Sequence, residues 1–125
     1  MTLPQFRFTA AIPAALLACV SLTACGGGGD GSAVKISADE SALEYDPSAT
    51  TAGPGETTIE FDNPAPLPHD LVLNAPDGTK AGETEMITGS DASFDVNLTP
   101  GTYTFYCSVP GHEEGGMKGT LTVAQ

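Results

Sequence analysis

The chain has 125 residues, with sixteen acids against four basic residues and a formal net charge of −12. This length suits one small domain. So acidic a surface excludes nucleic acid and anionic lipid headgroups as direct partners, because like charges repel. It would attract a basic partner protein in a salt-dependent way. Solubility alone, or adaptation to high salt, would explain the same composition.

The first 24 residues have the pattern of a secretory signal peptide. Arg7 comes before an apolar stretch at residues 10–20, and small residues follow at 23–24. This order of charge, apolar segment and small residues is typical of an export signal. The apolar stretch is short and is interrupted by Pro13, which argues against a membrane-spanning helix. We therefore expect residues 1–24 to be a signal peptide.

The segment Leu22-Thr23-Ala24-Cys25 resembles the lipobox of bacterial lipoproteins. In that family the signal is cut before the cysteine, which then carries lipid. The resemblance implies a lipid on Cys25 and a glycine-rich tether over residues 25–33. The alternative is an ordinary cleavage nearby that leaves Cys25 free or removes it. With Cys19 lost in the signal, Cys107 would be the one free thiol of an exported protein, and metal binding is a sufficient reason for it.

Residues 34–125 show short runs of alternating apolar and polar residues, separated by turn residues. The expected strands are 34–38, 41–46, 56–62, 69–74, 93–98, 102–107 and 118–123, with a weaker one at 83–88 and an irregular edge strand or loop at 47–55. Seven or eight short strands without a long amphipathic helix predict an all-β, Greek-key β-sandwich. The predicted core residues are Val34, Ile36, Leu43, Ile59, Phe61, Leu71, Leu73, Phe94, Val96, Leu98, Tyr103, Phe105, Leu121 and Val123. Tyr103 follows a Pro-Gly turn, where its hydroxyl is expected to tie the corner.

Two different sequence features determine the positions of the two histidines. Three prolines in residues 63–68 predict a stiff connector that brings His69 to the head of an apolar row. Four residues separate Cys107 from His112, and four more separate His112 from Met117. Individually, His69 could be a buried imidazole, Cys107 an inert thiol and Met117 a core residue. Together, two imidazoles, a thiolate and a thioether form the ligand set of a blue copper centre.

Three stretches of the chain resemble the cupredoxin family of small type 1 blue copper proteins, which includes plastocyanin, azurin, auracyanin and halocyanin. They are Pro68-His69-Asp70-Leu71-Val72, the strand at residues 99–107, and the loop from Cys107 to Gly119. The resemblance covers residues 34–125 and implies a cupredoxin-like copper-binding domain with one type 1 site. It implies His69, Cys107 and His112 as the trigonal ligands and Met117 as the axial ligand. The His112 ring edge would pass the electron within an apolar patch of Pro66, Leu67, Pro110 and Gly111.

Asp70 departs from this family, which usually has asparagine at that position. Its carboxylate can accept hydrogen bonds from the backbone or hydroxyl of Ser108 but cannot donate. Its charge would favour Cu(II) and lower the reduction potential. Glu113 and Glu114 are expected to be solvated, and Met86 to serve packing.

The function expected from these features is electron transfer by a monomer, without enzymatic activity. The protein would be lipid-anchored on the periplasmic or extracytoplasmic face of a membrane. Its redox partner would be a c-type cytochrome, a respiratory oxidase or a photosynthetic complex. The alternative is a copper chaperone, storage or resistance protein that uses the same ligands. The absence of further His and Met clusters favours the electron carrier, and a multicopper enzyme would need more histidines than the sequence contains.

Overall fold

The computed structural model describes residues 31–125, and these form nine strands. The strands are β1 (Ser32–Ala38), β2 (Tyr45–Asp46), β3 (Ala49–Ala52), β4 (Gly55–Asn63), β5 (Val72–Asn74), β6 (Lys80–Glu83), β7 (Ser90–Leu98), β8 (Gly101–Tyr106) and β9 (Lys118–Val123). The predicted signal peptide, the lipidation site Cys25 and most of the tether lie outside the described residues. Among the residues described, no helix is long and apolar enough to cross a membrane.

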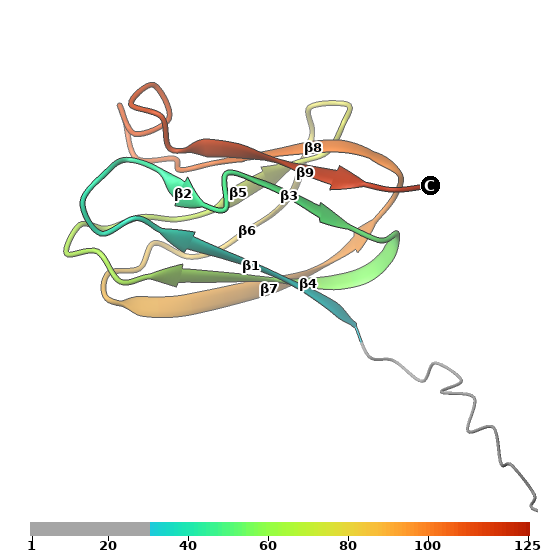
Figure 1. The fold of residues 1–125 in the computed structure, drawn as a ribbon, viewed down its shortest axis with the longest axis horizontal. Coiled ribbons are helices and arrows are strands. Elements are labelled where there is room, and N and C mark those ends of the chain that lie inside the picture. The colour runs from blue at the N-terminus through green and yellow to red at the C-terminus, as the bar shows by residue number, and fades with distance from the viewer. Residues whose placement is uncertain (1–30) are drawn as a thin grey trace, which may run out of the picture.

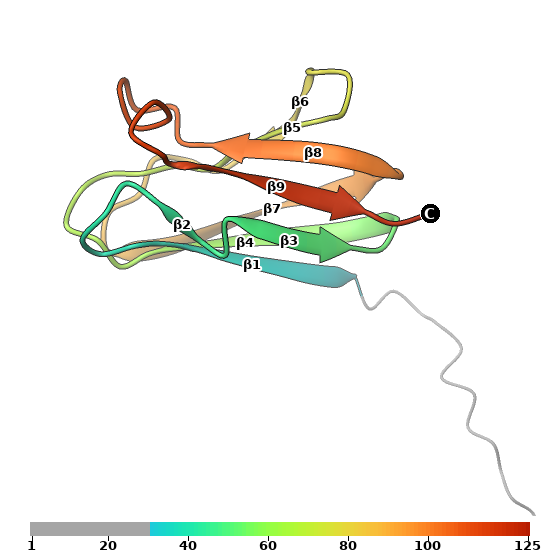
Figure 2. The same ribbon diagram turned by 45° about the horizontal axis from the view of Figure 1, so that its top comes forward.

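The strands form two sheets packed face to face, which confirms the predicted all-β sandwich (Figures 1 and 2). One sheet has the order β2-β1-β4-β7 and the other the order β3-β9-β8-β5-β6. Within them, β1 runs parallel to β4 and β3 runs parallel to β9, and the other pairs are antiparallel. Consecutive strands such as β4 and β5 lie in different sheets, so the chain crosses between the sheets more than once and both sheets contribute to the same end loops.

The core lies between the two sheets and contains most of the predicted residues. Ile59, Leu71 and Phe105 are fully buried. Leu43, Phe94 and Val96 are only partly buried, contrary to expectation. Phe94 and Val96 belong to β7, which forms an edge of its sheet and is therefore covered on one side only.

The predicted corner at Tyr103 is confirmed, because the Thr99 backbone N–H donates to the Tyr103 hydroxyl at 3.1 Å.

Two expected strands differ from the structure. Residues 41–44 form a turn, because the Asp39 carboxylate accepts from the backbone N–H groups of Ser41 and Ala42 and competes with strand pairing. The strand expected at residues 83–88 is displaced to β6, and Ile87 instead makes an isolated bridge with His69. The irregular segment at 47–55 contains the edge strand β3, which pairs with β9.

The loops that carry the candidate ligands gather at one end of the sandwich. The β4–β5 and β8–β9 connections lie at the left end in Figure 1, together with the β1–β2 loop. The start of β1 and the C-terminus lie at the opposite end. The described chain therefore begins as far from this loop cluster as the sandwich allows.

Candidate metal centre

His69 is held between strands as an isolated bridge. Its backbone N–H donates to the Ile87 carbonyl at 3.0 Å, and the Ile87 N–H donates back to the His69 carbonyl at 2.9 Å. The side chain is buried at 1% exposure. The imidazole therefore comes from a backbone position whose N–H and carbonyl groups are both bonded to Ile87.

Cys107 directly follows β8, and its loop closes back onto it. The Cys107 N–H donates to the Met117 carbonyl at 3.1 Å, and the Met117 N–H donates to the His112 carbonyl at 3.0 Å. Gly116, with φ of 119°, adopts a conformation that side chains disfavour and lets the chain turn back toward β9. The loop thus brings three candidate ligands from one short segment to the same end of the core.

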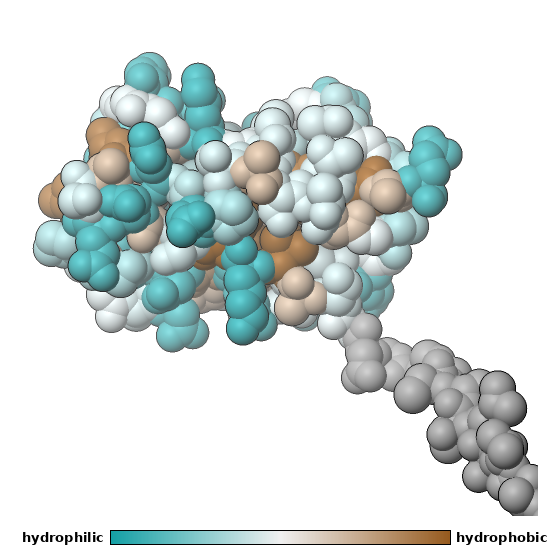
Figure 3. Space-filling model, viewed as in Figure 1, coloured by the Kyte–Doolittle hydropathy of each residue, from teal (hydrophilic) through white to brown (hydrophobic). Residues whose placement is uncertain are grey.

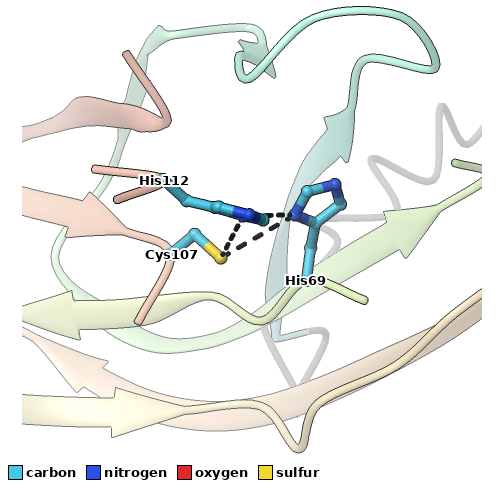
Figure 4. Close-up of side chains that lie close together, drawn as sticks. All are labelled: His69, Cys107 and His112. Atoms are coloured by element: carbon cyan, nitrogen blue, oxygen red, sulfur yellow. Dashed lines mark hydrogen bonds between the residues drawn. The ribbon is translucent and has the colours of Figure 1, made fainter. Parts of the chain in front are cut away.

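The nitrogen and sulfur donors of three predicted ligands converge (Figure 4). His69 Nδ1 and His112 Nδ1 are 3.1 Å apart, and Cys107 Sγ lies 3.8 Å and 3.7 Å from them. A point equidistant from the three atoms lies about 2.1 Å from each, close to the roughly 2.0–2.3 Å of metal bonds to imidazole and thiolate. The chain therefore fits a metal ion held in a trigonal plane.

Met117 is fully buried and belongs to the main core cluster together with Cys107. Its neighbours in the loop, Glu113 and Glu114, are exposed, as expected. The structure therefore places a thioether residue beside the donor triangle and leaves the loop carboxylates in solvent.

Burial sets the protonation of the donors in the metal-free protein. Burial raises the pKa of the Cys107 thiol, so the thiol keeps its proton at neutral pH and metal binding must release it. Burial, together with the nearby His112, lowers the pKa of His69. The His69 ring is therefore neutral at pH 7 and has a lone pair available for a metal.

Asp70 ties the two ligand segments together, as the sequence predicts. Its carboxylate accepts from the Ser108 N–H at 2.7 Å and from the Ser108 hydroxyl. Its backbone carbonyl accepts from the buried Tyr45 hydroxyl at 2.5 Å. Sequence reasoning missed Tyr45, whose only signal was an aromatic residue within the strand expected at residues 41–46.

The loops that carry His69 and His112 expose several apolar residues. His112 is partly exposed, Leu67 is 53% exposed, and Pro66, Pro110 and Gly111 are exposed. Figure 3 shows brown side chains at this end of the molecule beside largely hydrophilic ones. Met86 is 47% exposed, contrary to the expectation that it serves packing.

The fold and the donor triangle define a copper-binding β-sandwich. The model of the family described as copper binding proteins, plastocyanin/azurin family, matches residues 32–124. Plastocyanins from Daucus carota and Petroselinum crispum are 39% and 38% identical over 97 residues, which cover 72% of this chain and 97% of each relative. The crystal structure of dithionite-reduced auracyanin from Roseiflexus castenholzii superposes with a TM-score of 0.70 at 26% identity and covers 78% of this chain and 100% of that one.

The chain belongs to the plastocyanin/azurin family of copper-binding proteins. This confirms the cupredoxin resemblance seen in the sequence. Family, fold and clustered donors together show a blue copper electron-transfer protein with one type 1 copper site.

Proposed function

We propose that His69, Cys107, His112 and Met117 are the copper ligands, with Met117 in the axial position. The donor triangle supports this most directly, because its dimensions fit one ion without rearrangement of the chain. Thiolate and thioether suit Cu(I), and imidazole also suits Cu(II), so the set tolerates both oxidation states. When bound, copper would supply a one-electron couple.

The burial of the proposed ligands fixes the geometry of the copper site. His69 and Cys107 are buried, and Met117 is fully enclosed in the core. A core packed to native density resists the rearrangement that a change of oxidation state would otherwise cause. The site therefore carries electrons and does not bind and transform a substrate, and we infer that the protein is not an enzyme.

The electron would leave through the His112 ring. Among the proposed ligands His112 is the one with solvent exposure, and Pro66, Leu67 and Pro110 are exposed apolar residues of the two loops that carry His69 and His112. A flat apolar contact of small area suits brief redox encounters. The acidic remainder of the chain would attract a basic partner, such as a c-type cytochrome, an oxidase or a photosynthetic complex.

We further propose that the protein is exported and is held by a lipid on Cys25 as a monomer at the extracytoplasmic face of a membrane. The start of β1 lies at the end opposite the metal centre (Figure 1). An anchor on that side would leave the His112 surface free to meet a partner.

Stopped-flow mixing of the reduced copper protein with an oxidised basic c-type cytochrome tests this function. We expect rapid electron transfer that slows as salt increases, while copper remains bound. Leu67→Asp should slow the reaction by about tenfold, corresponding to about 1.4 kcal/mol of lost contact energy. Thr102→Asp adds the same charge at an exposed position on β8 and should have little effect. Copper that passes to a Cu(I) chelator or acceptor faster than electrons pass to the cytochrome would instead indicate the copper-handling function.

A further inference from the structure

The connector before His69 has few backbone N–H groups with which to form hydrogen bonds. Residues 64–68 include Pro64, Pro66 and Pro68, none of which has a backbone N–H. Such a segment cannot join a strand ladder, yet it enters the buried site that contains His69. Some other group must hold it in place.

Asn63, the last residue of β4, supplies that group. Its side chain is fully buried, at 0% exposure. The amide nitrogen donates to the Leu67 carbonyl at 2.8 Å and to the Ile87 carbonyl at 2.7 Å, and the amide oxygen accepts from the Ala65 N–H at 3.0 Å. One side chain thus bonds to two residues of the connector, Ala65 and Leu67, and to Ile87, the bridge partner of His69.

The Ile87 carbonyl links Asn63 directly to His69. That oxygen accepts from the Asn63 amide at 2.7 Å and from the His69 N–H at 3.0 Å. A shift of Asn63 would therefore move the backbone from which the His69 ring projects.

An amide is the side chain that this position requires. It offers two donors and an acceptor, and all three are used. An ionised carboxylate has no donor, and it would face two carbonyl oxygens in a buried place.

We propose that Asn63 is a positioning residue that holds His69 Nδ1 within bonding reach of the ion shared with Cys107 and His112. The proposal rests on the ligand assignment made above. Asn63 ties the segment that contains His69 to Ile87, and Asp70 ties the same segment to the loop of Cys107. The two side chains therefore brace the site through different partners.

The first test uses the metal-free protein, so it does not depend on copper. In Asn63→Ser, the His69 amide hydrogen is expected to exchange with solvent at least about tenfold faster, through local opening of the connector. The Thr120 amide of β9, which donates to the Ser48 carbonyl, should keep its rate relative to global unfolding. Leu98→Ala is the matched control, because Leu98 is buried where β7 pairs with the start of β4, away from the site.

The second test uses the copper-loaded protein. Asn63→Ser and Asn63→Asp are expected to bind copper about 10- to 100-fold more weakly than the wild type and to change the relative intensities of the visible bands. Asn63→Asp keeps an acceptor for Ala65 and loses both donors, so it tests the donors if the serine variant does not fold. Variants that match Leu98→Ala in copper affinity, visible spectrum and His69 exchange would overturn the proposal. A wild-type protein without a blue band would refute the proposed ligand set, while the exchange rates would still decide whether Asn63 holds His69.

Discussion

Replacing Asp70 by asparagine would remove one negative charge beside the metal centre and leave its hydrogen bonds in place. The amide oxygen can still accept from the Ser108 N–H, which is now 2.7 Å from the carboxylate, and the amide nitrogen can donate to the Ser108 hydroxyl oxygen. The geometry of the brace is therefore preserved. The change in reduction potential then reports the charge itself.

The size of the effect follows from the position of the carboxylate. Ser108 is bonded to Cys107, so the charge lies on the order of 7 Å from the centre of the donor triangle. At that separation Coulomb's law gives about 2.4 kcal/mol for an effective dielectric constant of 20 and about 0.6 kcal/mol for that of water. For a one-electron couple, a tenfold change in the equilibrium constant is about 1.4 kcal/mol, or about 59 mV. The two energies therefore predict that Asp70→Asn raises the reduction potential by about 25 to 100 mV.

Protein-film or mediated voltammetry at pH 7 measures this shift. Glu113→Gln is the matched control, because it removes the same charge from an exposed position in the same loop, where solvent and salt screen it. We expect the Glu113 variant to shift the potential much less than the Asp70 variant. An unchanged or lowered potential in Asp70→Asn, or an equal shift in both variants, would refute the electrostatic reasoning.

Three further predictions concern the folded chain. Tyr45→Phe deletes the buried bond to the Asp70 carbonyl, so it should cost about 1–3 kcal/mol and lower Tm by about 4–8 °C per kcal/mol, and an unchanged melting curve would contradict this. Gly119→Ala would place a methyl group 2.3 Å from a Phe105 ring carbon, so it should lower the midpoint of urea unfolding by an amount equivalent to about 1–3 kcal/mol. The pKa of His69 is lowered below its ordinary value of 6.5 in the folded chain, so the His69 ring binds protons more readily in the unfolded state. The metal-free protein should therefore lose stability as pH falls below about 6.5. Denaturant titrations from pH 7 to 5 check this, and His69→Gln should flatten the slope.

The candidate ligands could be found from the sequence because they are rare and regularly spaced. The sequence contains two histidines, and His112 lies midway between Cys107 and Met117. Because Cys107, His112 and Met117 lie within one short loop, the fold brings these three residues close together. The alternating strand pattern likewise identified the core position of Phe105, since a period of two specifies which side chains face inward.

The residues that brace the site could not be found in this way. Tyr45 bonds to a carbonyl 25 positions away, and Asn63 bonds to one 24 positions away. Neither contact follows from local periodicity, because it depends on which strands the fold places side by side. The same limit explains Ile87, whose pairing with His69 replaces the strand expected around it.

The most direct test of the account is the visible absorption spectrum of the protein after addition of Cu(II), then a reductant, then an oxidant. A thiolate of Cys107 bound to Cu(II) in a trigonal site with His69 and His112 predicts an intense blue band that bleaches on reduction and returns on reoxidation. The band should be absent from Cys107→Ser. A wild-type protein that binds Cu(I) tightly but shows no such band would contradict the electron-carrier account.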